Sequence, residues 1–554
     1  MNRTESGAPT GRPDMRDGDH FPVVIVGSGP TGMTAALLLG SYGISCLVLD
    51  RWDDVYPQPR AVHLDDEVYR IISDLGLAEE FAAISRPGRG LRLCDKQIRT
   101  LAEFERDPDI RPNGFPQANM FDQPDLEILM RSHLPRFDTV QTRGGCEIID
   151  VQNQNDSVKV LFTDTADGAR HWVTADFVLG CDGANSVVRS SIGSKMEDLG
   201  FAQRWLVVDI STDADLQQWE GVHQVCDGER AATYMRIGSS RYRWEFRMHD
   251  NEDLDSFADL DAIRPLIAPW LGDVARDDLK LIRCAEYTFR AQVVDRWRDR
   301  RVFLLGDAAH LTPPFIGQGM GAGLRDARNL IWKLAGVLGG SLPETALDSY
   351  QTERKAHATA MIKLAVQIGW AMTGGSRVTS AVRKNIAPLL GYVPVIGTKA
   401  TDSTTPRLPR SEYVLRSPVS VMGLPGSLCP NSVLDNGERL DRVAPGQFLF
   451  VTSTPLTVGQ RREVTRRGAV PIEVPASSDL GVWLRRGHAI AAIVRPDRTV
   501  MASGRSVPAL HTKVPTTAFR QHADPPPAER TRDVDAAPAV TSRPRTRTRT
   551  KRHA

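Results

Sequence analysis

The stretch FPVVIVGSGPTGMTAALLLGSYGISCLVLD, from Phe21 to Asp50, decides the fold of this chain. It reads as a short apolar strand, a glycine-rich turn, a helix and a second apolar strand. The turn places Gly27, Gly29 and Gly32 in GxGxxG spacing. The first glycine allows the turn, the second lets a pyrophosphate approach the backbone, and the third lets the helix pack on the sheet. Since Asp50 at the end of the second strand can hold a ribose hydroxyl, the stretch predicts a dinucleotide-binding α/β unit.

A second unit of strand, loop and helix lies much later, from Arg301 to Leu338. An apolar strand runs into Gly306 and Asp307 and then into a loop rich in proline and glycine. The helix that follows repeats apolar residues at intervals of three and four, which indicates one buried face. Such a unit directs the N–H groups of a helix start at the loop, where bare glycine backbone would admit a flat ligand. Taken alone, the pattern also fits a tight turn between two core elements.

Three separated motifs of the chain resemble those of the FAD-dependent aromatic hydroxylases, the single-component flavoprotein monooxygenases. They are the stretch from Gly27 to Asp50, VLGCDGANSVVR at Val178 to Arg189, and LLGDAAHLTPPFIGQG at Leu304 to Gly319. Within this family the chain is most similar to the 3-(3-hydroxyphenyl)propionate hydroxylase group, for example through YPQPRAVHLDDEVYRIISDLGL at Tyr56 to Leu77.

The resemblance implies an α/β fold in which a Rossmann-like FAD-binding domain is interleaved with a β-sheet substrate domain and followed by a C-terminal thioredoxin-like domain. Within the substrate sheet, charged and apolar residues alternate from Arg241 to Met248, which predicts a strand with one polar and one apolar face. The expected boundaries are a disordered leader at 1–20, the FAD-binding domain at 21–200 and 282–375, the substrate sheet at 201–281, a helical segment and linker at 376–430, a thioredoxin-like domain without CxxC at 431–506, and a disordered basic tail at 507–554.

The resemblance also implies which residues bind FAD. Arg60 would lie against the cofactor, Gln123 and Asp307 near its ribityl chain, and Asp182 on the path of the nicotinamide. NADH or NADPH would bind only transiently, because the sequence has no second dinucleotide fingerprint. The full set of expected cofactor-binding residues is Gly27, Gly29, Pro30, Thr31, Gly32, Asp50, Arg51, Arg60, Gln123, Asp182, Gly306, Asp307, Pro314, Gly317, Gly319 and Met320.

The candidate substrate pocket draws on the sheet and on the proline-rich loop. Its expected residues are Tyr242, Trp244, Tyr287, Phe289 and Pro313, although the aromatic residues among them also fit the core of the sheet. His310 fits either a catalytic base or a side chain that packs the loop, and the second reading is favoured because it belongs to the GDAAH signature. No catalytic residue and no metal site are assigned.

For the family, the implied reaction is hydroxylation of a phenolic aromatic acid similar to 3-(3-hydroxyphenyl)propionate. NAD(P)H would reduce FAD, and O2 would then give a flavin hydroperoxide that transfers the oxygen. Two alternatives stay open: a tailoring hydroxylase of a larger polyketide-type aromatic, and a non-catalytic flavin-binding regulatory module. The sequence does not decide between NADH and NADPH, and it leaves the substrate, the catalytic base and the oligomeric state open.

Composition narrows the class of protein. A chain of 554 residues predicts two or three domains. The 69 basic and 68 acidic residues nearly cancel, so no nucleic-acid partner is implied. Seven scattered cysteines without a CxxC pair indicate a cytoplasmic protein without disulfides, and the absence of a long apolar run predicts no membrane span. A homodimer is compatible with the family.

Overall fold

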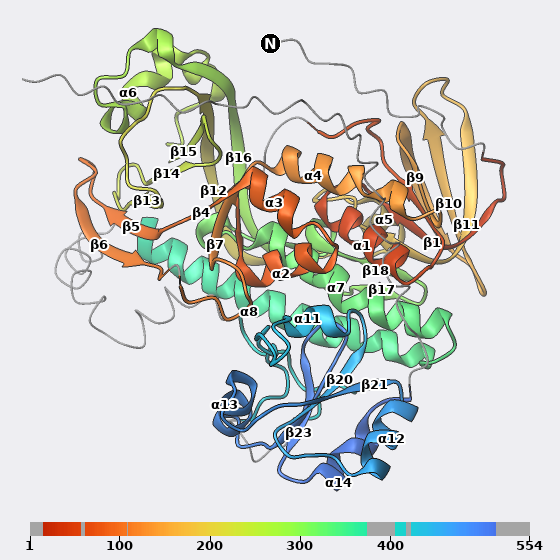
Figure 1. Cartoon of the computed structure of the whole chain (residues 1–554). Coiled ribbons are helices and arrows are strands. Elements are labelled where there is room, and N and C mark those ends of the chain that lie inside the picture. Colours follow the sequence, from red (N-terminus) through yellow and green to blue (C-terminus); the bar gives the residue numbers. More distant parts are fainter. Residues whose placement is uncertain (1–14, 57–60, 108, 374–404, 417–422, 517–554) are drawn as a thin grey trace, which may run out of the picture. The chain divides into compact units, whose positions relative to one another are not determined.

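A computed structural model describes residues 15–56, 61–107, 109–373, 405–416 and 423–516. In these residues the strands form four sheets, two with eight strands, one with four and one with three (Figure 1). Most of the leader, the tail and the segment 376–430 lie outside the described residues. No helix within the described part of the chain has the length and apolar character needed to cross a bilayer.

The first sheet joins the three sequence motifs. Its parallel strands lie in the order β18, β11, β1, β2 and β8, and helices α1 (Pro30–Ser41) and α7 (Gly319–Leu338) pack against them. Strand β1 begins at His20, inside the segment expected to be a leader. The eight strands are β1 (His20–Val26), β2 (Cys46–Leu49), β8 (Val140–Arg143), β9 (Cys146–Asn153), β10 (Val158–Asp164), β11 (Arg170–Gly180), β17 (Arg298–Asp299) and β18 (Val302–Leu304).

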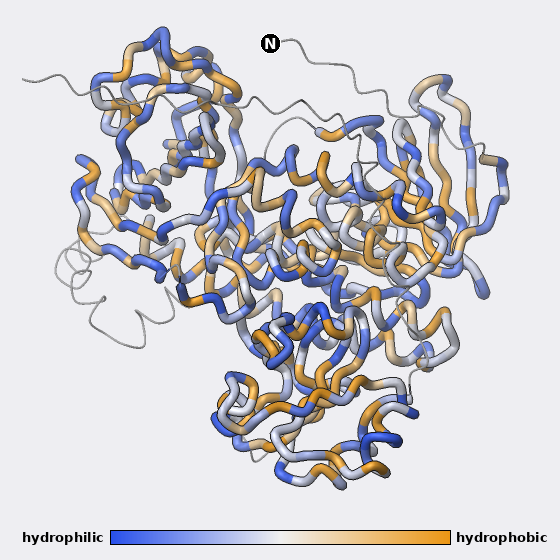
Figure 2. Tube along the Cα trace, viewed as in Figure 1, coloured by the Kyte–Doolittle hydropathy of each residue, from blue (hydrophilic) through white to orange (hydrophobic). Residues whose placement is uncertain are grey.

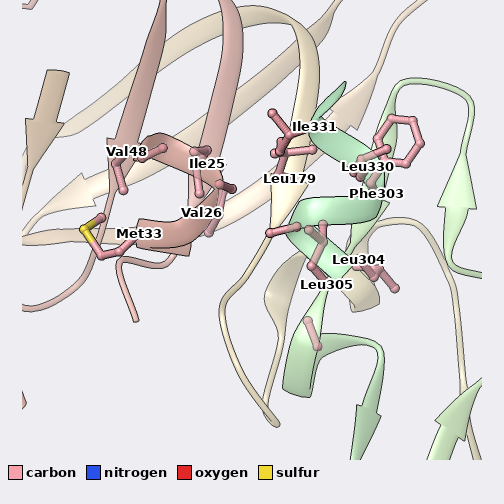
Figure 3. Packing of buried hydrophobic residues seen from close by; sticks show 14 of the residues in the cluster. Ile25, Val26, Met33, Val48, Leu179, Phe303, Leu304, Leu305, Leu330 and Ile331 are labelled. Atoms are coloured by element: carbon pink, nitrogen blue, oxygen red, sulfur yellow. The ribbon is translucent and has the colours of Figure 1, made fainter. Parts of the chain in front are cut away.

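Apolar side chains from distant parts of the sequence form the core between this sheet and its helices (Figure 3). Full burial of one such side chain stabilises the fold by about 1.5–3 kcal/mol, so this core holds the three motifs together. The labelled residues, all fully or almost fully buried, are Ile25, Val26, Met33, Val48, Leu179, Phe303, Leu304, Leu305, Leu330 and Ile331.

The second sheet contains the strands expected at 201–281 and extends beyond them. Two earlier strands join it because β5 pairs in parallel with β13, a long-range pairing that local periodicity does not reveal. The strands, in spatial order, are β19 (His310–Leu311), β16 (Lys280–Val294), β12 (Met196–Ser211), β15 (Arg241–Arg247), β14 (Ala232–Arg236), β13 (Val222–Val225), β5 (Gly90–Cys94) and β6 (Thr100–Glu105).

The two faces of strand β15 have different environments. Tyr242, Trp244 and their apolar neighbours pack against helix α6 (Leu260–Leu271) in a core of their own. The middle of the polar face, at Arg243 and Glu245, is also buried, and the Arg243 guanidinium donates two hydrogen bonds, of 2.7 and 2.9 Å, to the Asp209 carboxylate on β12. The alternating pattern predicted the two faces but could not reveal this partner, which makes burial of the charged side tolerable.

A small sheet and several helices are formed by segments between strands of the two large sheets. The sheet has the order β3 (His63–Asp65), β7 (Ala118–Phe121) and β4 (Ser85–Pro87). The helices are α2 (Asp66–Asp74), α3 (Ala78–Ile84), α4 (Gln123–Ser132) and α5 (Val187–Ser191). The long helix α8 (Asp348–Thr373) follows α7 and packs against it.

The C-terminal part has a sheet of its own, in the order β21, β20, β22, β23. Strands β20 and β21 are parallel, whereas β22 is antiparallel to β20 and β23 is antiparallel to β22. In Figure 2 hydrophobic residues follow these strands, whereas helix α12 is mostly hydrophilic. The elements are α11 (Leu440–Val443), β20 (Phe448–Thr452), α12 (Val458–Arg466), β21 (Ala469–Glu473), α13 (Asp479–Arg486), β22 (Ala491–Val494), β23 (Val500–Gly504) and α14 (Val507–Leu510).

The expectation of a disordered tail from residue 507 does not hold for residues 507–516. Val507, Leu510 and Val514 are buried in the core of the C-terminal sheet. Their spacing of three and four residues is typical of a helix. The abundance of proline in the surrounding sequence favoured the prediction of disorder instead.

Buried ion pairs connect the C-terminal part to helices α7 and α8. The Glu353 carboxylate lies 2.8 Å from the Arg495 guanidinium and 3.0 Å from the Lys333 amine, and it accepts a 2.5 Å hydrogen bond from the Ser411 hydroxyl. Burial lowers the pKa of Lys333 to about 8, although Glu353 opposes the shift. Burial alone would raise the pKa of Glu353, but Arg495 and Lys333 outweigh it and hold that pKa well below its usual value.

We predict that Glu353→Gln destabilises the protein by about 3–5 kcal/mol, because it leaves the buried Lys333 amine without its carboxylate and leaves Asp497 as the one remaining counter-charge of Arg495 among the described residues. Urea unfolding at pH 7 measures this loss. Asp261→Asn serves as the control, since it removes one partner of the solvent-exposed pair with Arg276 and should leave the midpoint unchanged. Equal effects of the two substitutions would contradict the importance of the buried network.

Candidate active site

The three sequence motifs meet at one edge of the first sheet. Val26 at the end of β1 pairs with Gly180 of β11, and Gly180 pairs with Leu304 of β18. Because parallel strands end at the same edge, the loops that begin after these residues lie side by side. Backbone hydrogen bonds continue the pairing past the strand ends: the Cys181 amide donates to the Val26 carbonyl (2.7 Å), and the Leu305 amide donates to that of Gly180 (2.9 Å).

Glycine is required at two of the three fingerprint positions by packing alone. Gly27 has a φ of +101°, and a Cβ there would overlap the Cys181 carbonyl. A Cβ at Gly32 would overlap the Gly27 carbonyl, so helix α1 could not approach the turn. By contrast, a Cβ at Gly29 would meet nothing within 4 Å. Gly29 therefore borders open space at the N-terminus of α1, which suits an anionic phosphate.

Asp50 lies beside the same turn. Its Oδ2 accepts hydrogen bonds from the Ser28 amide (2.6 Å) and the Ser28 hydroxyl (2.8 Å), and its Oδ1 accepts one from the Trp52 amide (2.9 Å). The adjacent Arg51 is exposed and stacks over the Trp52 ring. Arg131 of helix α4, which no sequence motif indicated, donates a 2.6 Å hydrogen bond to the Ser28 hydroxyl. It brings a positive charge to the glycine-rich turn.

The GD motif forms a short turn against the start of α1. Gly306 has a φ of +60°, and a Cβ there would lie 2.8 Å from the Thr31 hydroxyl oxygen. Gly323 of α7 also approaches Thr31 so closely that a side chain would collide with it. Asp307 is exposed although the residues on either side of it are buried. The turn thus presents one carboxylate at the edge where the motifs meet.

His310 is part of a buried network below this turn. Its Nε2 lies 2.8 Å from Asp326 Oδ2, which also accepts a 3.0 Å hydrogen bond from the Gly306 amide, and Arg354 donates to Asp326 Oδ1 (2.8 Å). Burial alone would raise the pKa of Asp326, but His310 and Arg354 hold it below its usual value. Since His310 is fully buried in this network, its placement favours the packing role over that of a catalytic base.

Two other expected cofactor residues are held by local contacts. The Gln123 side-chain oxygen accepts a 2.7 Å hydrogen bond from the Ala61 amide. The Asp182 carboxylate accepts hydrogen bonds from the Ser186 hydroxyl (2.5 Å) and the Val188 amide (3.1 Å), and burial raises its pKa. Asp182 therefore anchors the start of α5, while Arg60 lies outside the described residues.

The glycine-rich end of the long loop packs against the segment that precedes α2. Gly317 has a φ of +62°, and a Cβ there would lie 2.6 Å from the His63 ring. Burial lowers the pKa of His63 to about 4, with Arg106 acting in the same direction, so the ring is neutral at pH 7. Pro314 belongs to a short helical turn, Pro314–Ile316, and Gly319 and Met320 begin helix α7.

Three carboxylates lie at the start of α2, and two of them pair with one arginine of α7. The Arg325 guanidinium lies 2.5 Å from Asp65 and 2.8 Å from Glu67. Asp66 accepts a 3.0 Å hydrogen bond from Asn113 with one oxygen, while the other has no partner among the described residues. Burial, and then the neighbouring Asp65, raise the pKa of Asp66 to about 7.

Aromatic side chains connect the long loop to the second sheet. The Phe315 ring lies 5.8 Å from that of Trp205 and 5.6 Å from that of Phe201, both on β12, and Trp205 lies 5.7 Å from Phe289 on β16. Pro313 is buried just before Phe315. This face of the sheet is therefore turned toward the loop that begins at β18.

Tyr242 and Trp244 lie on the opposite face of the sheet from this loop, in the core beneath α6. Their placement differs from the expected pocket, because residues that alternate along β15 with those facing the loop must point away from it. Tyr287 is half-buried and lies under the Arg283 guanidinium. Of the five expected pocket residues, Phe289 contacts Trp205 of this aromatic cluster, Tyr287 pairs with Trp205 across the strands, and Pro313 lies two positions before Phe315.

A pocket of about 320 Å³ opens beside the same aromatic residues. Its size falls within the range of small-molecule sites. It lies between the first part of β12, the end of β15 and the end of α8, and its lining residues are Gly200, Phe201, Ala202, Gln203, Arg247, Trp370 and Thr373.

The family model described as "FAD binding domain" matches residues 20–365, which include all three loops at the edge of the first sheet. The chain belongs to this family. The prediction of an FAD-dependent aromatic hydroxylase is confirmed at the level of the family, and FAD is the cofactor that the loops must fit. The open space at Gly29, the positive helix start and the exposed Asp307 fit the pyrophosphate and hydroxyl groups of FAD.

Curated relatives of this FAD-binding protein cover nearly the whole chain. A probable NADH-specific resorcinol 4-hydroxylase of Rhodococcus jostii is 34% identical over 87% of this chain and 92% of its own length. A 3-(3-hydroxy-phenyl)propionate/3-hydroxycinnamic acid hydroxylase of Burkholderia cenocepacia is 33% identical over 87% of this chain and 93% of its own length.

A solved structure supports the fold of the FAD-binding protein. The flavin-dependent monooxygenase PieE, crystallised with FAD and substrate, superposes with a TM-score of 0.76 at 22% sequence identity. The match covers 91% of this chain and 98% of that one, so it includes the C-terminal sheet as well as the first two.

We predict that Gly29→Glu yields a folded protein without FAD. The side chain has room, because a Cβ meets nothing within 4 Å, but its negative charge would occupy the phosphate position and repel the cofactor. Flavin absorbance per mole of purified protein measures the loss. Gly459→Glu is the matched control, since its Cβ also meets nothing, and it should retain full flavin. Equal flavin content in both variants would rule out the Gly29 site.

We also predict that Asp66→Asn stabilises the protein increasingly as the pH rises. A raised folded-state pKa means that ionisation opposes folding, so the penalty in the wild type grows as the pH rises from 3.8 to about 7 and is constant above. The difference in unfolding free energy between variant and wild type should widen by about 2–3 kcal/mol between pH 5 and pH 8. Urea unfolding at both pH values measures it. A difference in unfolding free energy that stays the same at both pH values would show that the folded-state pKa of Asp66 is not raised.

Proposed function

We propose that this protein is an FAD-dependent monooxygenase that hydroxylates a phenolic aromatic compound with NADH or NADPH and O2. The observation that carries the proposal is the convergence of three loops at one sheet edge, one of which contacts aromatic residues of the second sheet through Phe315. The names of both relatives, a resorcinol hydroxylase and a hydroxyphenylpropionate hydroxylase, support the reaction class.

In this proposal each loop holds one part of FAD. The turn at Gly27 to Gly32 and the start of α1 bind the pyrophosphate, with Arg131 adding positive charge, and Asp50 holds the adenosine ribose. Asp307 holds the ribityl chain, assisted by Gln123. The segment from Pro314 to Met320 lies along the ring, where the start of α7 stabilises negative charge. Arg60 stays a candidate from the sequence alone.

FAD, when bound, accepts electrons from NAD(P)H and activates O2 for transfer of one oxygen atom to an aromatic ring. The residues of the chain position the substrate ring and exclude water from the site. Phe201, Phe289 and Phe315 form an apolar wall that orients a ring and excludes water, which protects the activated oxygen from loss as hydrogen peroxide. The reaction requires no metal ion.

The C-terminal part and the cysteines support two further proposals, one on a domain and one on the cellular location. We assign residues 431–506 to a thioredoxin-like domain, since two parallel strands followed by two antiparallel ones suit that fold. It lacks CxxC, which leaves it a packing or dimerisation role. All seven cysteines are free, which supports a reducing cytoplasm as the location.

The assay that tests the proposal follows NADH and NADPH oxidation, O2 uptake and hydrogen peroxide together, with 3-(3-hydroxyphenyl)propionate and resorcinol as substrates. A phenolic substrate should accelerate NAD(P)H oxidation at least tenfold, with one ring hydroxylation per NAD(P)H and little peroxide. No acceleration by any phenol would favour the non-catalytic flavin-binding alternative. Acceleration that yields only peroxide would instead point to a different, larger aromatic substrate.

A further inference from the structure

Arg247 differs from four other arginines on or beside the second sheet. Arg241, Arg243 and Arg230 each pair with a carboxylate, namely Asp122, Asp209 and Glu252, and Arg204 pairs with Glu286. Arg247, at the end of β15, lies within ion-pair distance of no carboxylate in the part of the chain that the structure describes. Its guanidinium donates a 3.1 Å hydrogen bond to the Thr373 carbonyl.

This half-buried arginine lines the pocket of about 320 Å³. The Thr373 carbonyl fixes one edge of the guanidinium, and the Thr373 hydroxyl accepts a hydrogen bond from Gln203 (3.3 Å), which ties β12 to the end of α8. A partly desolvated guanidinium with a free edge gains most from a planar anion, which it can bind through two parallel hydrogen bonds.

The pocket also has an aromatic side that leads to the proposed flavin loop. Phe201 lies 6.5 Å from Trp370, whose ring is largely exposed, and 5.6 Å from Phe315 of the loop. Phe201 thus joins Phe315 to the pocket that Arg247 lines, and an acidic side chain placed in this pocket would lie beside Arg247. Glu245, two residues earlier on the same face, is buried, and this burial raises its pKa although Arg243 opposes the shift.

We propose that Arg247 binds a carboxylate on the side chain of the aromatic substrate and thereby selects phenolic acids over neutral phenols. The inference rests on the proposed function and narrows its substrate class. It distinguishes a substrate such as 3-(3-hydroxyphenyl)propionate, which has a carboxylate, from resorcinol, which has none. It makes Arg247 a specificity-determining residue that takes no part in the oxygen transfer.

The test compares wild type, Arg247→Gln and Arg247→Lys, with Arg264→Gln as a control that removes an exposed arginine of α6. The probes are 3-(3-hydroxyphenyl)propionate and the corresponding alcohol, in which CH2OH replaces the carboxylate. Calorimetric binding to the FAD-loaded protein without NAD(P)H gives Kd, and steady-state assays give KM and kcat.

For the acid, Arg247→Gln should raise both Kd and KM on the order of 30-fold while kcat changes less than threefold, and lysine should restore part of the affinity. For the alcohol, neither constant should change, and the control should resemble wild type. Equal losses for acid and alcohol, or a wild type that binds both alike, would overturn the assignment.

The two proposals fail in different ways. Hydroxylation of resorcinol without any binding of the acid would leave the proposed function intact and overturn the role of Arg247. Binding of the acid that depends on Arg247, without hydroxylation of any phenol, would support the anion site and overturn the proposed reaction.

Discussion

The parallel register of β1, β11 and β18 is the constraint on which the rest of the structure depends. It places Val26, Gly180 and Leu304 in one row, so the three loops that follow must begin at the same edge. Space at that edge is so limited that Gly27 and Gly32 have no room for a side chain, whereas Gly29 remains open. This contrast separates glycines that the fold needs from a glycine that a ligand needs. The loops thus form a phosphate site through packing of the backbone.

Buried charge organises what surrounds this edge. His310, Asp326 and Arg354 fix the turn at Gly306, and Glu353 with Lys333 and Arg495 fixes the C-terminal part to α7 and α8. Removing one member of either network would destabilise the fold, because the remaining charges are buried away from water. The buried placements of His310 and of Lys333, whose pKa is lowered, thus favour packing roles for both side chains. Arg247 stands apart, since its half-buried charge faces a pocket.

Much of the fold could be predicted from local patterns. The glycine fingerprint, the strands that precede Asp182 and Asp307 and the four C-terminal strands all have short-range signals, and the structure contains them. Features that depend on partners distant in sequence could not be predicted. The Asp209 partner of Arg243, the pairing of β5 with β13 and the contact of Arg131 with Ser28 have no local signature. The alternation of residues at 241–248 predicted that the strand has two faces, but it could not indicate which face lies toward the site. Tyr242 and Trp244 were therefore expected in the pocket.

The central claim, that these loops and the aromatic face form one site for oxygen transfer to a phenol, is tested most directly by isotope incorporation. The FAD-loaded protein is supplied with NAD(P)H, a phenolic substrate and O2 labelled with heavy oxygen, and the product is analysed by mass spectrometry. The account predicts one labelled oxygen atom on the ring per molecule of product. A product whose new oxygen comes from water, or turnover without any ring hydroxylation, would contradict it.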